Sequence, residues 1–189
     1  MKRNTRLTFE IAEGVYAPAE DSELLIESVG VAQGQRVLEV GMGSGFAAVH
    51  CAAAGASVVA TDLNPSAARC TRGNAAANGA GVVVVVCDLA NAVRGPFDVV
   101  LFNPPYLPGK MGQPAADGGA GGVEVVSRLL ADLPRLLATD GKCLIVLSSH
   151  SDVGMLKREH PSLEFQEKGT KRLFFEVLIS YEVRATKNQ

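Results

Sequence analysis

The sequence has no tryptophan, no long apolar run and no closely spaced cysteine pair. A membrane-spanning helix needs about 18 or more consecutive apolar residues, and the N-terminal segment 1–6 leads into no hydrophobic signal core. We therefore expect a cytoplasmic protein that does not bind a membrane. The four cysteines are widely separated, so we expect buried thiols and no metal site.

Basic residues are not in excess. The formal net charge is −2, which argues against a broad nucleic-acid-binding face. Hydrophobic residues make up 47% of the 189 positions and charged residues 20%, a composition typical of a globular protein. We predict one domain over residues 1–189, in which residues 1–34 form an N-terminal strand and helix extension.

The chain alternates predicted strands and helices. Apolar β-branched runs predict strands at 36–40, 57–61, 82–87, 97–102, 141–147, 163–165 and 173–183. Amphipathic or alanine-rich stretches predict helices at 20–30, 46–55, 65–78, 123–138 and 152–159. A turn at Gly169-Thr170 would join the last two strands as a hairpin. This alternation favours a doubly wound α/β sheet, mostly parallel, with one antiparallel strand from the C-terminal hairpin.

The segment Asn103-Pro104-Pro105-Tyr106 directly follows the buried-type strand 97–102. Two prolines force the chain out of the sheet. A polar amide and an aromatic ring thus stand at the carboxyl end of a strand, where open α/β sheets bind ligands. The alternative is a turn that ends the strand and does nothing more.

Acidic residues end or follow three other strands, and a glycine-rich turn lies beside the first of them. Glu39 precedes Gly41-Met42-Gly43-Ser44-Gly45, Asp62 ends the next strand and Asp88 follows the third. One such acid is usually solvated or capping, but three beside a glycine turn favour a nucleoside site. Asp62 suits ribose hydroxyls.

The same edge suggests which nucleoside. Asp88 could accept a hydrogen bond from an adenine amino group, with Leu63 and Leu89 against the base. Glu39 could orient the glycine loop or attract a cationic part of the ligand. The Gly-x-Gly-x-Gly spacing departs from the dinucleotide fingerprint, and a carboxylate repels a pyrophosphate but attracts a sulfonium. S-adenosyl-L-methionine therefore fits better than NAD.

These motifs together resemble class I S-adenosylmethionine-dependent methyltransferases. The segment Val15-Tyr16-Ala17-Pro18-Ala19-Glu20-Asp21-Ser22 further resembles the N-terminal motif of glutamine methyltransferases that act on class-1 translation release factors. The resemblance implies a Rossmann-like seven-stranded sheet. It also implies a cofactor site made by Ser22, Glu39, Gly41, Gly43, Asp62, Leu63, Asp88, Leu89 and Asn103. Relatives often have a tryptophan before Gly118-Gly119, which this chain lacks.

The chemistry predicted for the Asn-Pro-Pro-Tyr turn does not depend on the resemblance. An amide nitrogen is a poor nucleophile because its lone pair is delocalised. A pocket in which the Asn103 side chain and the Pro104 carbonyl accept its two N–H groups stabilises the charge that develops during attack. Tyr106 can pack on the planar group, and Pro105 completes the predicted substrate-binding turn. We expect no nucleophilic residue and no metal to be needed.

Two other functions remain open. The same turn could methylate an exocyclic amine in DNA or RNA, although the chain has no spare length for a target-recognition domain. A binding module without catalysis is the third possibility. Protein glutamine methylation, most simply of a Gly-Gly-Gln release-factor motif, is the function that we predict.

Residues 82–87 predict a partner. In the strand order of the family this strand lies at the sheet edge, and its five consecutive valines include no residue that blocks pairing. Another protein could add a strand there, unless helices cover both faces and the edge stays unpaired. The resemblance implies that the partner that pairs with residues 82–87 is a small zinc-binding activator subunit.

Overall fold

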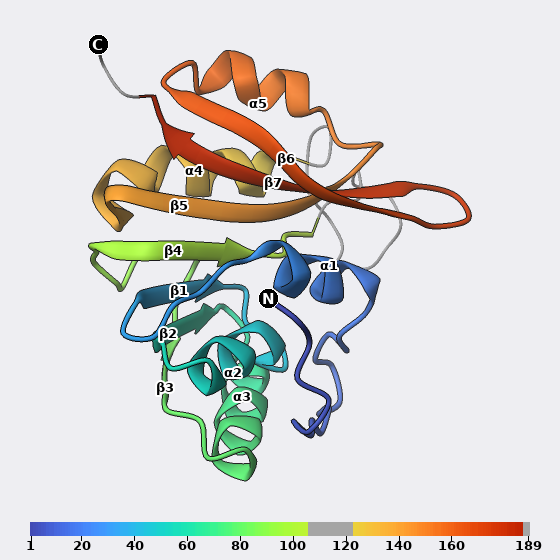
Figure 1. Cartoon of the computed structure of the whole chain (residues 1–189), viewed down its shortest axis with the longest axis vertical. Coiled ribbons are helices and arrows are strands. Elements are labelled where there is room, and N and C mark those ends of the chain that lie inside the picture. The colour runs from blue at the N-terminus through green and yellow to red at the C-terminus, as the bar shows by residue number, and fades with distance from the viewer. Residues whose placement is uncertain (106–122, 187–189) are drawn as a thin grey trace.

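The seven strands form one sheet in the order β3-β2-β1-β4-β5-β7-β6. The computed structural model describes residues 1–105 and 123–186. Strands β1 to β5 pair in parallel, whereas β7 pairs antiparallel with both β5 and β6. The predicted mostly parallel, doubly wound sheet with one antiparallel C-terminal strand is confirmed (Figure 1).

The elements follow the predicted alternation along the chain. Helices are α1 (Glu20–Ser28), α2 (Phe46–Ala53), α3 (Pro65–Ala77), α4 (Glu124–Leu136) and α5 (Val153–Glu159). Strands are β1 (Arg36–Val40), β2 (Ser57–Asp62), β3 (Val82–Val86), β4 (Phe97–Phe102), β5 (Leu137–Ser148), β6 (Leu163–Arg172) and β7 (Val177–Ala185). Among the described residues, no helix is both long and apolar enough to cross a membrane.

Helices cover both faces of the sheet, which explains the unbroken apolar strands. In β4, Val99 and Leu101 pack with α1, α2 and α3, whereas Val100 and Phe102 pack with α4 and α5. Each of these four side chains is at most 2% exposed. The sequence of a strand that is buried on both faces is a continuous hydrophobic run, not an alternation of hydrophobic and polar residues.

The predicted hairpin turn at Gly169-Thr170 is wrong. Both residues pair with β7 inside β6, and the turn lies at residues 173–176. Gly169 instead marks a bulge, because the register shifts between Glu167 and Gly169. A Cβ at Gly169 would lie 3.2 Å from Ser28 Oγ of α1, so the glycine allows the hairpin to pack closely on that helix.

Strand β5 begins at Leu137, four residues before the predicted start at Gly141. Leu137 already pairs with Phe97, and the register then shifts before Val99 pairs with Lys142. A Cβ at Gly141 would lie 2.8 Å from the Phe97 carbonyl oxygen. The glycine therefore serves a close backbone approach within an irregular strand, not a turn before it.

Residues 1–19 contain no strand, although a strand and helix were predicted within 1–34. Two asparagines, one in α3 and one directly after it, form hydrogen bonds with this backbone instead. Asn74 accepts from the Glu10 N–H at 2.8 Å and donates to its carbonyl at 2.9 Å. Asn78 makes the same pair of bonds with Thr8, at 3.0 and 2.7 Å. These two asparagines, one helical turn apart, thus supply the backbone hydrogen bonds that a neighbouring strand would supply.

The two edges of the sheet differ in character. Strand β6 carries charged residues along its length, which discourages pairing with another chain. Strand β3 is the other edge, as predicted. Val82 and Val84 pack on the α1–α3 side, but Val83 is 61% exposed and Val86 45% exposed. Helices therefore do not fully cover this strand.

Candidate functional site at the carboxyl edge of the sheet

The turn between β1 and α2 requires its three glycines. Gly41, Gly43 and Gly45 have φ angles of 68°, 50° and 77°, which side chains other than glycine rarely adopt. A Cβ at Gly45 would lie 2.6 Å from Thr71 Cγ2 of α3. Thr71 also donates to the Gly43 carbonyl at 3.1 Å. The turn is thus fixed in shape before any ligand binds.

Glu39 is buried beneath this turn. Its Oε2 accepts a hydrogen bond from the Ala48 N–H at 2.7 Å, and the residue is 6% exposed. Burial raises the pKa of Glu39 to about 8, and the neighbouring Asp62 adds to the rise, while backbone N–H groups of α2 oppose it. Glu39 therefore orients the glycine loop by holding the start of α2, one of its two predicted roles.

We expect Glu39 to make stability depend on pH. The folded chain keeps this carboxyl protonated up to a pKa of about 8, whereas an ordinary glutamic acid has a value of 4.5. The unfolded chain therefore binds fewer protons between these values, and the free energy of unfolding falls as pH rises through the window.

A Glu39→Gln variant keeps an acceptor for Ala48 but does not titrate. Its free energy of unfolding, relative to wild type, should rise between pH 5 and pH 8.5 in urea titrations. A difference that stays constant across this range would show that Glu39 has no raised pKa.

Asp62 links the end of β2 to the glycine turn. Its Oδ2 accepts from the Gly43 N–H at 3.0 Å and its Oδ1 from the Asn64 N–H at 2.8 Å. Each carboxylate oxygen keeps a second lone pair, and the residue is partly exposed. The next residue, Leu63, is 70% exposed, so an apolar side chain lies free beside the carboxylate.

Asp88 lies at the carboxyl end of β3, where it forms an ion pair with Arg128 of α4. Sequence reasoning missed Arg128, because it comes from a helix forty residues away. Leu89 has a φ of 45°, and it is the one non-glycine residue with positive φ in the described chain. Backbone strain of this kind clusters at ligand sites.

Asp21 fixes the N-terminal part of the site. Its Oδ1 accepts from the Ser22 N–H at 2.6 Å and from Ser22 Oγ at 3.1 Å, and Tyr16 donates its hydroxyl to Oδ2 at 2.7 Å. Asp21 is 3% exposed and Ser22 8%. A Cβ at Gly43 would lie 3.7 Å from the Tyr16 carbonyl oxygen. The predicted residue Ser22 is thus held near the glycine turn through Asp21, which the predicted site omitted.

Asn103 has an unmet hydrogen-bond acceptor. Its Oδ1 is buried and has no hydrogen-bond partner within the described chain. Pro104 beside it is buried and Pro105 partly buried, whereas Tyr106 lies outside the described residues. An unpaired buried polar atom costs about 1–3 kcal/mol. The structure therefore places a preformed acceptor at the carboxyl end of the central strand β4.

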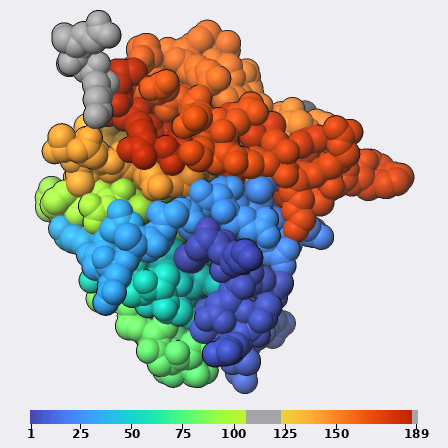
Figure 2. Space-filling model, viewed as in Figure 1, coloured from blue at the N-terminus to red at the C-terminus, as the bar shows by residue number. Residues whose placement is uncertain are grey.

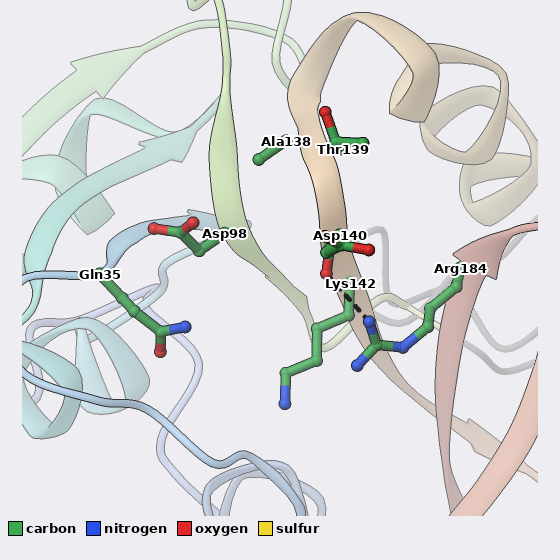
Figure 3. A pocket seen from close by; sticks show the side chains of 7 residues that line it. All are labelled: Gln35, Asp98, Ala138, Thr139, Asp140, Lys142 and Arg184. Carbon is green, nitrogen blue, oxygen red and sulfur yellow. Dashed lines mark hydrogen bonds between the residues drawn. The ribbon is translucent and has the colours of Figure 1, made fainter.

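A cavity of about 450 Å³ lies elsewhere, near the amino ends of β1 and β4 (Figure 3). The side chains that line it include Gln35, Asp98, Lys142 and Arg184. Arg184 donates to the Asp140 carbonyl at 2.9 Å. None of the predicted site residues lines this cavity, so it is not part of the predicted cofactor site.

Residues 6–171 match the methyltransferase small domain family. The chain belongs to this family. A putative protein N5-glutamine methyltransferase of Methanocaldococcus jannaschii is 39% identical over 143 residues, which cover 71% of this chain and 73% of that protein. The mouse methyltransferase HEMK2 is 35% identical over 151 residues, 70% of this chain and 71% of that protein. The predicted relationship is confirmed.

Solved structures share the fold of this methyltransferase family member. One is a complex of Mtq2 and Trm112 from E. cuniculi, responsible for methylation of the eRF1 translation termination factor. It has a TM-score of 0.74 at 23% identity and covers 91% of this chain and 99% of that chain. A Pyrococcus furiosus methyltransferase has a TM-score of 0.76 at 19% identity, over 98% and 92%. The Rossmann-like seven-stranded architecture is thus shared.

Within this family fold, the predicted site residues divide into two groups. The Gly43 N–H donates to the Asp62 side chain and the Met42 N–H to the Thr61 carbonyl, which joins the glycine turn to the end of β2, and Glu39 lies below this turn. Asn103 directly follows β4, the strand next to β1. Parallel strands end at one edge, so these groups share the carboxyl edge of the sheet.

Proposed function

We propose that the protein transfers a methyl group from S-adenosyl-L-methionine to the side-chain amide nitrogen of a glutamine. The proposed substrate is the Gly-Gly-Gln motif of a class-1 translation release factor, and the proposed place of action is the cytoplasm. The observation that carries this proposal is the buried Oδ1 of Asn103, which follows β4, precedes two prolines and has no hydrogen-bond partner among residues 1–105 and 123–186.

The residues at the carboxyl edge fit the cofactor. Asp62 has lone pairs free for the two ribose hydroxyls, and Asp88 and the exposed Leu63 flank the place for a base. Buried Glu39 lies beneath the glycine turn, where a nearby positive charge would lower its pKa again. Bound there, S-adenosylmethionine supplies an electrophilic methyl group.

The chain's own contribution is to orient and polarise the amide. We propose that Asn103 Oδ1 accepts one N–H of the glutamine amide and that the Pro104 carbonyl accepts the other. Both interactions strengthen as positive charge develops on the attacking nitrogen. Pro105 and Tyr106 complete the binding turn in this proposal. Holding the nitrogen in line with the methyl carbon supplies further rate through proximity.

Methylation of an exocyclic amine in DNA or RNA is the alternative. It is less favoured because the net charge is −2, and binding to nucleic acid depends mainly on neutralising phosphates. A release factor glutamine methyltransferase of Rhodospirillum rubrum, 36% identical over 70% of this chain and 47% of that protein, adds to the support for a protein substrate.

A labelled methyl-transfer assay distinguishes these functions. The purified chain is offered a class-1 release factor, the same factor with its Gly-Gly-Gln glutamine changed to alanine, duplex DNA and ribosomal RNA. We expect label in the unaltered release factor only. Label in either nucleic acid, or equal label in the altered factor, would contradict the proposal.

The proposed partner is a small zinc-binding activator subunit that pairs with β3. The Mtq2–Trm112 complex is an instance of a structural neighbour with a second chain. The Cys87 N–H donates to Asp62 O of β2. Because successive residues of a strand alternate in direction, the N–H groups of Val83 and Val85 face β2 and that of Val84 faces the open edge.

This alternation allows a sharp test of the partner. Val84→Pro removes an outward donor and should abolish co-purification with the partner while the thermal midpoint of the isolated chain changes by less than about 4 °C. Val84→Lys, which keeps the N–H, should retain binding. Val85→Pro removes an inward ladder donor and should unfold the chain at a lower temperature. Undiminished pairing in the Val84→Pro variant would exclude strand addition at β3.

A further inference from the structure

The hairpin between β6 and β7 presents two phenylalanines to solvent. Phe174 is 92% exposed and Phe175 85% exposed. Their rings meet edge to face, with centroids 4.6 Å apart. The tip projects from the body of the molecule (Figure 1) and forms the protrusion in the space-filling view (Figure 2). Two adjacent aromatic rings this exposed differ from the scattered apolar residues that any surface has.

Turn chemistry does not explain these two residues. The Leu173 N–H donates to the Glu176 carbonyl at 2.8 Å, so Phe174 and Phe175 are the two central residues of the loop. Two-residue hairpin loops favour Asn-Gly or Gly-containing pairs with positive φ. Neither phenylalanine has positive φ. Phe174 and Phe175 thus contradict the residue preferences of a two-residue hairpin loop, and they gain no burial in return. Such a departure indicates a functional requirement.

The tip is held rigidly. The Val177 N–H donates to Ser149 Oγ at 3.1 Å, and the Ser149 N–H donates to the Val177 carbonyl at 2.8 Å. His150 Nε2 lies 3.1 Å from the Phe175 carbonyl oxygen. On the other strand, Lys171 donates to Glu23 of α1 at 2.9 Å. A fixed aromatic anchor loses little conformational entropy when it binds a partner.

The tip lies at the carboxyl edge of the sheet, as does Asn103. Ser148, at the carboxyl end of β5, pairs with Leu178 near the start of β7. Residues 173–176 therefore extend beyond the carboxyl ends of the parallel strands. Strand β7 is two positions from β4 in the sheet, about 10 Å across at the usual strand spacing. The proposed activator edge β3 is six positions from β6, about 29 Å away.

Glu176 adds a second, independent observation at the base of the tip. Its Oε2 is buried and has no hydrogen-bond partner within the described chain. Burial of a carboxylate oxygen without a donor costs free energy. A backbone or side-chain N–H of a bound protein would satisfy it.

We propose that Phe174 and Phe175, with the adjacent Glu176, are the docking site for the folded body of the protein substrate. This inference rests on the proposed function. A glutamine in an extended loop can reach Asn103 only if the domain that carries it rests on the enzyme nearby. An apolar recess in that domain would receive the two rings, and an N–H at its border would donate to Glu176. Aromatic anchors surrounded by polar groups are typical of binding hot spots.

The test compares a folded release factor with a short Gly-Gly-Gln peptide. In the Phe174→Ala/Phe175→Ala double variant of the full chain, we expect the Kd for the release factor, measured by calorimetry with S-adenosylhomocysteine present, to rise about tenfold or more. The kcat/KM for the peptide should not change. Phe174→Leu/Phe175→Leu keeps apolar volume and should give an intermediate Kd.

A variant at Glu176 separates docking from folding. Glu176→Leu removes the unpaired oxygen, so its thermal midpoint should equal or exceed that of wild type while the Kd for the release factor rises. An unchanged Kd in both variants, or equal losses for peptide and folded factor, would overturn the docking site. So would a change in self-association alone, measured by sedimentation. If wild type bound the factor through the tip but methylated neither substrate, docking would stand and the proposed function would fail.

Discussion

Replacement of Asn103 by alanine should nearly abolish methyl transfer, with a loss of about 10²–10³-fold in kcat. In the proposed mechanism its Oδ1 interacts with charge that develops only in the transition state, and loss of one such group typically costs about 10²–10³-fold. The Kd for S-adenosylmethionine should stay within about tenfold of wild type. Single-turnover transfer and calorimetry measure the two quantities separately.

The unpartnered state of Asn103 Oδ1 makes this prediction sharper. Most buried amides lose hydrogen bonds when truncated, so activity and stability fall together. Here Oδ1 has no hydrogen-bond partner within the described chain, and its removal relieves a desolvation cost. The thermal midpoint of Asn103→Ala should therefore lie within about 4 °C of wild type. Wild-type turnover in this variant would refute the proposed mechanism, and unfolding would refute the view that Oδ1 is held ready for a ligand.

Asn103→Asp provides a matched comparison. It has nearly the same shape and keeps an acceptor oxygen, but it replaces the amide NH₂ group with a second oxygen and adds a negative charge. We expect turnover between those of wild type and the alanine variant, because acceptance of the amide N–H groups is retained. An aspartate variant as inactive as the alanine variant would show that charge, and not acceptance alone, controls this turn.

Elements buried on both faces could be predicted closely from the sequence. Strands β1 and β4 have the predicted bounds because their apolar runs leave one packing solution. Helix α3 also begins where predicted, since Asn64 accepts from the Ser66 N–H at 2.9 Å and Pro65 occupies the first helical position. Residues within or next to each element determine these boundaries, so they can be predicted from short stretches of sequence.

Features set by distant contacts could not be predicted in this way. Gly169 resembles a turn residue in sequence, but its role follows from the approach of Ser28 and Leu24 in α1. The true turn has two phenylalanines, which turn propensities disfavour. The pairing of Asn74 with Glu10 likewise joins residues 64 positions apart.

The candidate site shows the same division. The glycine turn and the strand-end acids are local signals, and the structure gathers them at one edge of the sheet. The ion pair of Asp88 with Arg128 depends on tertiary packing. So does the lack of a partner, within the part of the chain that the structure describes, for one oxygen each of Asn103 and Glu176. Residue type alone does not indicate whether a buried acceptor has a donor.

Replacement of Asp62 by alanine should weaken S-adenosylmethionine binding more than replacement of Asp88. Asp62 holds the glycine turn through the Gly43 N–H and the start of α3 through the Asn64 N–H, so the variant loses both the proposed ribose acceptor and the shape of the turn. Asp88 lies in a partly exposed ion pair with Arg128, and exposed pairs contribute little. We expect a loss near the upper end of about 1–3 kcal/mol for Asp62→Ala and near the lower end for Asp88→Ala.

Asp62→Asn distinguishes the two functions of this carboxylate. The amide can still accept from one backbone N–H, but it offers only one acceptor oxygen and its NH₂ group replaces the other. Calorimetric Kd values should therefore rank wild type, Asp62→Asn and Asp62→Ala from tightest to weakest, while the thermal midpoint of the asparagine variant falls less than that of the alanine variant. Arg128→Ala is the control for Asp88, since it frees that carboxylate without removing it and should leave the Kd within about twofold. Unchanged affinity in both alanine variants would remove the nucleoside site from these strand ends.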